Sequence, residues 1–399
     1  MRKSFCILMI IISVYLISCT TSDGIVLSSG EKATIRVTLE NSTFPAEIIV
    51  DNIRTGRATP DTVSVLPGSH VLKVFLPGYK AEPESIVTVM QEKAFKEFSF
   101  SVRETNSATI YINTIPAGAI LMIDGIEWGQ TPLRVEGIAH GFHSITIRKS
   151  GFKTITAGLN LEENQFFSQN YQLERSNVVL LEHFSNTGCP PCPEADATIH
   201  RVMQELDSIE IAAVSYHPDF PSPSDPFYLY DPGFIGERVD YYRIFSTPSV
   251  ILEGEQIYFY SYEDLEEQLK EKIVEHQHQP PGHLQMEIFV DERSPTSIAG
   301  NVKITNLSQD EFSARLMAVA VLKELLFEEP PGTNGQKDFY DLFYKAVPSL
   351  NDKEINLQPN SELLLPFTLE IENEMDRNFQ LVLFVQDDAR QVIETISYP

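Results

Sequence analysis

The chain has 399 residues, with 30 Lys and Arg against 56 Asp and Glu, and a formal net charge of −26. A surface this acidic repels nucleic acid and anionic lipid, so the composition excludes a nucleic-acid partner. With 42% hydrophobic residues, the length allows about two to four domains with ordinary cores.

The first segment has the layout of a secretory signal. Arg2 and Lys3 form a short positive region, and residues 5–17 are almost wholly apolar. This run is too short for a spanning helix and ends close to Cys19. It resembles the bacterial lipoprotein box, which implies removal of residues 1–18 and lipidation of Cys19. An ordinary signal with a chance cysteine is the alternative. Thr20, where an aspartate favours inner-membrane retention, indicates the outer membrane and leaves the membrane face open.

Cysteine usage narrows the chemistry. Four cysteines occur, of which Cys6 leaves with the signal and Cys19 takes the lipid. Only Cys189 and Cys192 remain, in a protein that meets oxidising conditions outside the cytoplasm. The sequence therefore leaves one cysteine pair, spaced as Cys-x-x-Cys.

After a tether at 19–30, two copies of one unit follow, at 31–103 and 104–175. Asp51 recurs as Asp124 and His70 as His143, at the same offset. Short runs of alternating apolar and polar residues, separated by Gly, Pro and Asp, predict a small antiparallel β-sandwich in each copy. His70 and His143 are either metal ligands or strand histidines with ordinary hydrogen bonds, and we favour hydrogen bonds.

The second copy resembles the PEGA domain, and the first copy resembles it more loosely. That family implies a β-sandwich with a spacer or binding role and no chemistry of its own. The resemblance rests on Ile115-Pro116-Ala117-Gly118-Ala119, Ile123-Asp124-Gly125, Thr131-Pro132 and Gly151-Phe152-Lys153, and in the first copy on Pro45-Ala46-Glu47 and Pro77-Gly78-Tyr79-Lys80.

The third segment, 176–280, predicts alternating strands and helices. A continuous apolar run at 178–181 is typical of a strand buried on both faces. The cysteine pair comes next, followed by a helical pattern to residue 206. Further strands are predicted at 209–214, 249–252 and 257–260, with helices at 234–245 and 262–276 and a long loop at 217–232.

The run Cys189-Pro190-Pro191-Cys192 lies between a predicted strand and a predicted helix, and Thr247-Pro248 precedes a later strand. This order of elements and motifs resembles thioredoxin. The resemblance implies that Cys189 is the nucleophile and Cys192 the resolving thiol. It also implies that Pro248 is a cis-proline and that the Thr247 backbone contacts substrate. An inert disulfide and a metal site are the alternatives. A metal site is disfavoured because no second Cys-x-x-Cys or suitably spaced histidine pair completes it.

Two positions depart from that family. His183 falls where many members carry a buried acid. His183 or its neighbour Glu182 is therefore a candidate proton shuttle for the resolving step, with a purely structural role for both as the alternative. Gly188 stands where a tryptophan usually precedes the first cysteine.

Residues 180–186 together with the cysteine pair resemble the twenty-eight-kilodalton outer-membrane protein family of thioredoxin-like lipoproteins. The resemblance covers about 176–399 and implies a β-rich C-terminal region. Strand patterns across 283–399 predict an immunoglobulin-like β-sandwich, and its Pro- and Gly-rich loop at 328–338 is a candidate contact for a partner. His276, His278 and His283 are interpreted as solvated side chains, with a metal site as the alternative.

The predicted fold class is therefore multidomain α+β: two PEGA-like sandwiches, a thioredoxin-like α/β domain and a C-terminal sandwich. The first function hypothesis is a lipid-anchored envelope thiol–disulfide oxidoreductase without a cofactor. It would act on thiols or disulfides of exported proteins and depend on an unknown redox recycling partner. The second is a non-enzymatic surface or assembly protein with an inert disulfide, favoured by three of four domains being sandwiches.

Overall fold

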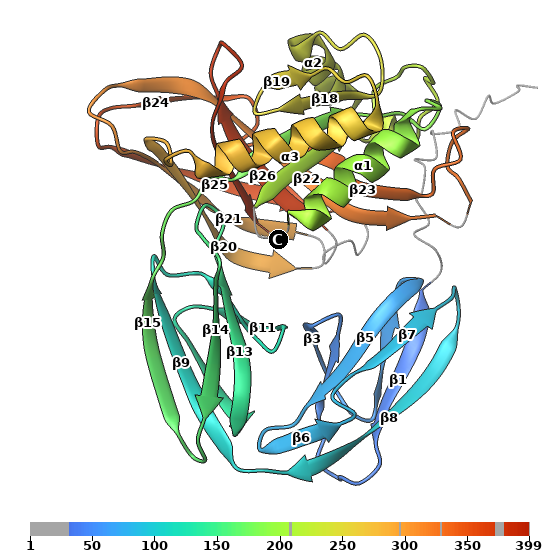
Figure 1. Cartoon of the computed structure of the whole chain (residues 1–399), viewed down its shortest axis with the longest axis vertical. Helices are drawn as coiled ribbons and strands as arrows, with labels where there is room; N and C mark the ends of the chain where they lie inside the picture. The colour runs from blue at the N-terminus through green and yellow to red at the C-terminus, as the bar shows by residue number, and fades with distance from the viewer. Residues whose placement is uncertain (1–31, 207–209, 295–296, 328, 372–378, 399) are drawn as a thin grey trace, which may run out of the picture.

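The computed structural model describes residues 32–206, 210–294, 297–327, 329–371 and 379–398. Within these ranges the chain forms 27 strands and three α-helices, so it is mostly β (Figure 1). No helix in them is long and apolar enough to cross a membrane. The predicted signal, Cys19 and the tether up to residue 30 lie outside the described residues.

The first unit is a β-sandwich of two four-stranded sheets. Their strand orders are β4-β1-β8-β6 and β3-β2-β5-β7. Alternate residues of each strand face the shared core, which follows from the two-residue period of a strand. The strands are β1 (Ala33–Leu39), β2 (Glu47–Val50), β3 (Ile53–Ala58), β4 (Asp61–Val65), β5 (Gly68–Phe75), β6 (Tyr79–Glu82), β7 (Ile86–Met90) and β8 (Phe95–Glu104).

The second unit repeats this arrangement. Its sheets run β12-β9-β15 and β11-β10-β13-β14, and a single bridge between Phe152 and Arg175 stands where β6 pairs in the first unit. The strands are β9 (Ser107–Ile115), β10 (Ile120–Ile123), β11 (Ile126–Gln130), β12 (Leu133–Ala139), β13 (Gly141–Arg148), β14 (Ile155–Leu161) and β15 (Phe166–Gln172).

The two equivalent histidines, His70 and His143, make the same contacts in their two units. His70 Nδ1 lies 2.7 Å from Asp51 Oδ2, and His143 Nδ1 lies 2.6 Å from Asp124 Oδ2. Each Nε2 lies 2.7 Å from a backbone carbonyl oxygen, that of Leu66 or Ala139. Both ring nitrogens therefore face acceptors, which favours the protonated ring. The hydrogen bonds to Asp51 and Asp124 raise the pKa of the two histidines.

The remaining strands correct the predicted fold class. The α+β description with a separate thioredoxin-like domain is wrong, because strands from 176–280 and from the C-terminal segment form one sheet. Nine described strands share it, in the order β19-β18-β16-β17-β23-β22-β26-β27, with β24 also paired to β22. They are β16 (Val179–Phe184), β17 (Ile211–Tyr216), β18 (Ser249–Leu252), β19 (Glu255–Ile257), β22 (Phe312–Leu326), β23 (Asp338–Ala346), β24 (Lys353–Leu357), β26 (Phe379–Gln386) and β27 (Val392–Tyr398).

The two segments join in one sheet at the edge of β17. Ser215 of β17 pairs in parallel with Leu342 of β23, which satisfies backbone groups that an independent domain would leave at a sheet edge. Phe184 and Val214 then share one core with Val319 and Phe384 of the C-terminal segment. We call this joint structure, residues 176–398, the body.

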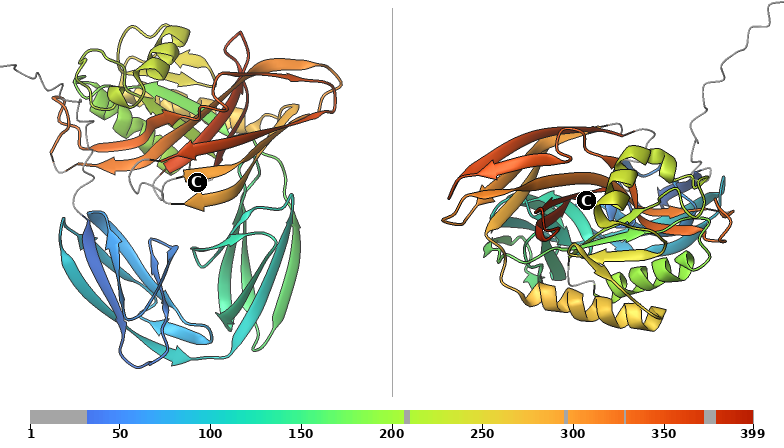
Figure 2. Two further views of the ribbon diagram at one scale, coloured as in Figure 1. Left: turned by 180° about the vertical axis from the view of Figure 1, so that it is seen from behind. Right: turned by 90° about the horizontal axis from the view of Figure 1, so that it is seen from above.

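The helices cover the N-terminal part of the body's sheet. Val179 and Leu181 of β16 pack with α1 (Cys192–Glu205) and α3 (Tyr262–His278), whereas Leu180 and Phe184 face α2 (Pro232–Tyr242). Beyond β23, a three-stranded sheet of β20 (Leu284–Ser294), β21 (Ser297–Asn306) and β25 (Glu362–Glu370) completes a sandwich with β22 and β26. In Figure 2, seen from above, α3 and the C-terminal strands lie on opposite sides of the body.

Candidate functional site

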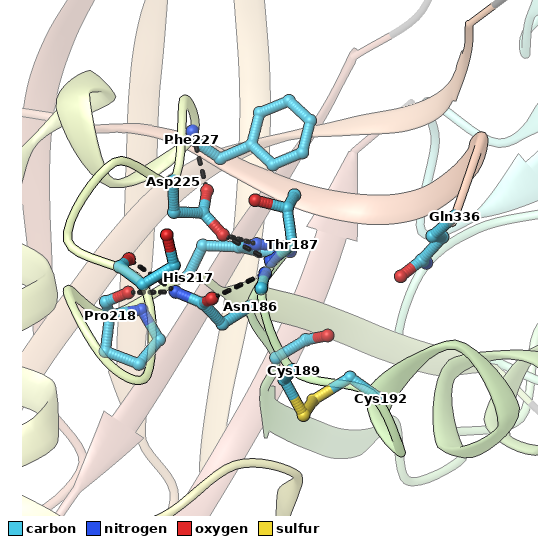
Figure 3. A network of polar contacts seen from close by, with 12 residues as sticks. Asn186, Thr187, Cys189, Cys192, His217, Pro218, Asp225, Phe227 and Gln336 are labelled. Carbon is cyan, nitrogen blue, oxygen red and sulfur yellow. Dashed lines mark hydrogen bonds and ion pairs between the residues drawn. A yellow bond between two sulfur atoms is a disulfide. The ribbon is translucent and has the colours of Figure 1, made fainter. Parts of the chain in front are cut away.

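The cysteine pair lies between β16 and α1. Cys189 and Cys192 form a disulfide with their Cα atoms 5.4 Å apart (Figure 3). Cys192 is the first residue of α1, and Pro193 follows it, a position where a missing N–H costs nothing. The unpaired N–H groups and the positive dipole end at the start of a helix stabilise a thiolate. The N-terminus of α1 would therefore stabilise the thiolate form of the reduced cysteine pair.

Both cysteines are buried in the disulfide form. Cys189 is 1% exposed and Cys192 0% exposed. Tyr262, at the start of α3, contributes to this environment because its hydroxyl donates to the Pro191 carbonyl oxygen at 3.0 Å. Direct access of a second protein to the sulfurs therefore requires a local movement.

A buried histidine–aspartate pair fixes the loop before the cysteines. Asp225 Oδ2 accepts from the Thr187 N–H at 2.6 Å and lies 2.9 Å from His217 Nδ1. Its other oxygen accepts from the Phe227 N–H at 2.9 Å. Burial alone raises the pKa of Asp225, but the charge of His217 and these hydrogen bonds outweigh burial and lower it. Thr187 is thus held in place two residues ahead of Cys189.

A segment of the C-terminal part covers the same loop. We call residues 332–336 the strap. The backbone N–H groups of Thr333 and Asn334 both donate to the Thr187 carbonyl oxygen at 2.9 Å. The Asn334 side chain donates to the carbonyl oxygens of Asn186 and Cys189, at 3.2 and 3.3 Å. The loop predicted to contact a partner thus contacts its own chain here.

Gly332 fits against Thr187 only because it lacks a side chain. A Cβ at this position would come within 2.3 Å of Thr187 Cβ and 2.5 Å of the Thr187 carbonyl oxygen. The strap therefore depends on glycine at its first residue.

His183 lies on the side of β16 that faces α1. Its Nε2 is 3.3 Å from Asp196 Oδ1, and Asp196 follows Cys192 by one helical turn. Asp196 Oδ2 accepts from Ser185 Oγ at 2.8 Å and from Gln336 of the strap at 2.9 Å. Burial raises the pKa of Asp196, yet His183 and Gln336 together lower it below the ordinary value.

This second pair retains unused hydrogen-bonding capacity. His183 Nδ1 has no hydrogen-bond partner among the described residues, and Asp196 Oδ1 faces His183 Nε2 at 3.3 Å. Both side chains line a small cavity with His200, Ser215 and Tyr340, among others. The arrangement can hold or move a proton beside α1.

Glu182 faces the opposite side of the sheet, as expected for the neighbour of His183 in a strand. It is fully buried and accepts from Arg238 at 2.7 and 2.8 Å and from the hydroxyls of Tyr216 and Tyr242 at 3.1 and 2.6 Å. Gln386 of β26 donates to the same Tyr242 hydroxyl at 2.9 Å. Glu182 therefore joins α2 to the C-terminal strands, away from the helix that carries Cys192.

Thr247 and Pro248 precede β18 and are joined by a cis peptide bond. Ser249, the next residue, pairs with Phe184 at the end of β16, so Pro248 lies beside the start of the cysteine loop. Both Thr247 and Pro248 are partly exposed. The structure thus brings Thr247, Pro248, His183 and the cysteine pair to one end of the sheet and leaves Glu182 on its other face.

Five residues of this site were not predicted from the sequence, because tertiary contacts bring them to the cysteine loop. They are Asp196, His217, Asp225, Asn334 and Gln336. Among them, only Asp196 had a local signal, its spacing of one helical turn after Cys192.

The histidines near the end of α3 make ordinary polar contacts. His276 lies 3.5 Å from Glu253, and His278 Nδ1 lies 2.7 Å from the Val274 carbonyl oxygen. No group of three or more metal-ligating side chains exists among the described residues.

Comparison with known proteins identifies one domain. Residues 107–177 match the PEGA domain, so the second β-sandwich is a PEGA domain. No curated protein matches the chain. Its structure is similar to HBP35 of Porphyromonas gingivalis, with 14% identity over 56% of this chain and 75% of that chain and a TM-score of 0.43. It is also similar to a domain of the outer membrane lipoprotein Omp28 from Porphyromonas gingivalis, with 13% identity, 30% and 88% coverage and a TM-score of 0.21.

Proposed function

We propose that this chain is a cell-envelope lipoprotein, anchored through Cys19, that exchanges thiols and disulfides with exported proteins. The observation that carries the proposal is the Cys189–Cys192 disulfide at the N-terminus of α1. That place favours a thiolate, which is the reactive form of cysteine. We also propose that residues 176–399 belong to the twenty-eight-kilodalton outer-membrane protein family.

The exchange proceeds in two displacements. In the reduced protein the Cys189 thiolate attacks a client disulfide, and one client sulfur leaves as a thiolate. Cys192 then loses its proton and attacks the Cys189 sulfur, which releases the second client thiolate and restores the disulfide. Two electrons pass from the pair to the client, and the reverse sequence oxidises a client dithiol.

The second displacement needs a proton acceptor near Cys192. His183 and Asp196 lie on the α1 side of β16 and have unused capacity, so we assign His183 to this step with Asp196 and Gln336 as positioning residues. In His183→Asn, resolution of a mixed disulfide should slow and its pH dependence should change, while alkylation of Cys189 remains as fast as in the unaltered protein. If the resolving step keeps its rate and pH profile, His183 has only a structural role.

The reduced full-length protein provides the direct test. A brief pulse of alkylating agent near neutral pH should modify Cys189 first, because its pKa should fall below the free-thiol value of about 8.5. Cys192→Ser should accumulate mixed disulfides with exported proteins, and Cys189→Ser should accumulate few. Equal, slow alkylation of both cysteines and a reduction potential below about −300 mV would identify an inert bridge.

The second candidate is a surface or assembly protein with a structural disulfide. The burial of both cysteines supports it, as does the β-sandwich architecture of most of the chain. The same alkylation experiment separates the two candidates, since an inert pair predicts no trapped clients.

A further inference from the structure

Aromatic side chains stand unusually exposed near the cysteine loop. Phe245 is 89% exposed, Tyr258 73% and Tyr260 100%. Large apolar rings favour burial, so side chains exposed to this degree in one neighbourhood indicate an interaction surface.

Two contacts place these rings at the cysteine end of the sheet. Tyr262, two residues after Tyr260, donates a hydrogen bond to the carbonyl oxygen of Pro191, between the two cysteines. Ser249 pairs with Phe184, which places the loop containing Phe245 beside the end of β16. We call Phe245, Tyr258 and Tyr260 the aromatic rim.

The charges around the rim are mainly negative. Glu194 follows Pro193 in α1, Glu263 lies in the first turn of α3, and Asp219 lies in the loop whose Pro218 carbonyl oxygen accepts from Asn186. All three are exposed. Arg243, at the end of α2, is an exposed cation near Phe245. The surrounding potential therefore favours a basic partner.

We infer that the aromatic rim docks an extended segment of an unfolded exported polypeptide, in which a cysteine is flanked by apolar and basic residues. The inference rests on the proposed thiol–disulfide exchange and names its substrate class. Tyrosine and phenylalanine side chains offer large contact area at low entropic cost, which suits recognition of segments with varied sequence. Folded proteins, whose apolar side chains are buried, offer the rim little.

The chemical step on such a segment balances without a cofactor. The peptide thiolate attacks the Cys189 sulfur, the bond between the two cysteines breaks, and Cys192 leaves as a thiolate that takes up a proton. A second thiolate of the same peptide then attacks the peptide sulfur of this mixed disulfide, so that a disulfide forms within the peptide and Cys189 leaves as a thiolate. The peptide is oxidised, and both electrons end on the cysteine pair.

The experiment measures oxidation of two synthetic dithiol peptides by the full-length disulfide protein. One peptide carries Phe and Lys around its cysteines, and the other carries Ser and Glu. Dithiothreitol serves as the small thiol that makes no use of the rim. Unaltered protein should oxidise the Phe–Lys peptide at least about tenfold faster than the Ser–Glu peptide, and rising salt should narrow that difference.

The variant Phe245→Ser combined with Tyr260→Ser should lower the ratio of the Phe–Lys peptide rate to the dithiothreitol rate about tenfold, chiefly through KM. The matched control is Phe142→Ser, because Phe142 is 75% exposed on β13 of the PEGA domain; its ratio should match that of the unaltered protein. An unchanged ratio in the rim variant, with exchange intact, would overturn the docking surface alone. Failure of the unaltered protein to exchange with either peptide, in the dithiol form with the disulfide protein and in the disulfide form with the reduced protein, would overturn the proposed function and the rim together.

Discussion

The strap offers a direct test of how the disulfide is shielded. In Gly332→Ala, the new Cβ would meet Thr187 at 2.3–2.5 Å, distances that no Cβ tolerates, so residues 332–334 must move away. That movement breaks the two hydrogen bonds from Thr333 and Asn334 to the Thr187 carbonyl oxygen. At about 1 kcal/mol each, their loss makes local opening about 2 kcal/mol easier.

If opening of the strap limits access to the sulfurs, this energy raises the rate of disulfide reduction by dithiothreitol about thirtyfold. The rate is measured by quenching with an alkylating agent and counting modified cysteines by mass spectrometry. Gly335→Asn is the matched control, because Gly335 has φ +84 with no atom close to its Cβ position and asparagine tolerates that conformation. An unchanged reduction rate, together with faster amide exchange at Asn334, would show that the strap does not control access.

Three further predictions concern the anchor, the body and the two sandwiches. Cys19→Ser should abolish lipidation and release the protein from membranes in a carbonate wash; retention would contradict the anchor. Glu182→Ala should lower the free energy of unfolding by about 3–5 kcal/mol, measured in urea, because it leaves Arg238 buried and unpaired; the exposed Glu163→Ala is the control. The raised pKa values of His70 and His143 imply stability that is complete below about pH 6.5 and lost as pH rises through the folded-state pKa values. The melting temperature of the double variant His70→Asn, His143→Asn should therefore change less between pH 5 and pH 9 than that of the unaltered protein.

Local patterns predicted the helices around the site well, whereas the strand expected at 257–260 lies at Glu255–Ile257. The helices expected at 234–245 and 262–276 correspond to Pro232–Tyr242 and Tyr262–His278, because apolar spacing and caps are local signals. Ser261, for example, caps α3 by accepting from the Asp264 N–H. The repeat was visible because Asp51 and Asp124 occupy the same hairpin position, where backbone φ is positive.

The pairing between distant strands left no such signal. The continuous apolar run at the centre of β22 shows that the strand is buried on both faces, but not that β23, its partner, also pairs with β17. For the same reason the strap and the His217–Asp225 pair were invisible: their partners lie far away along the chain, and only the assembled body brings them to Thr187.

The PEGA domain also takes part in the structure of the body, which bears on its predicted role as a spacer. Glu210 is buried and accepts from Ser150 Oγ, from the Gly151 N–H at 3.2 Å and from Ser397 Oγ at 2.8 Å. Burial raises its pKa. Arg175 donates to the carbonyl oxygens of Gly282 and Leu284 at 2.9 and 2.7 Å.

These contacts predict different stabilities for two deletion proteins. Removing 31–103 leaves all of them in place, so the remaining protein should melt cooperatively with little change in stability. Removing 31–175 eliminates Ser150 and Gly151, two of the three partners of Glu210, together with the two Arg175 bonds, hydrogen bonds worth about 1 kcal/mol each. The body should then lose about 3 kcal/mol, measured by urea denaturation monitored through tyrosine fluorescence. Equal stability of the two deletion proteins would show that the PEGA domain is a spacer after all, since its contacts with the body would then contribute nothing measurable.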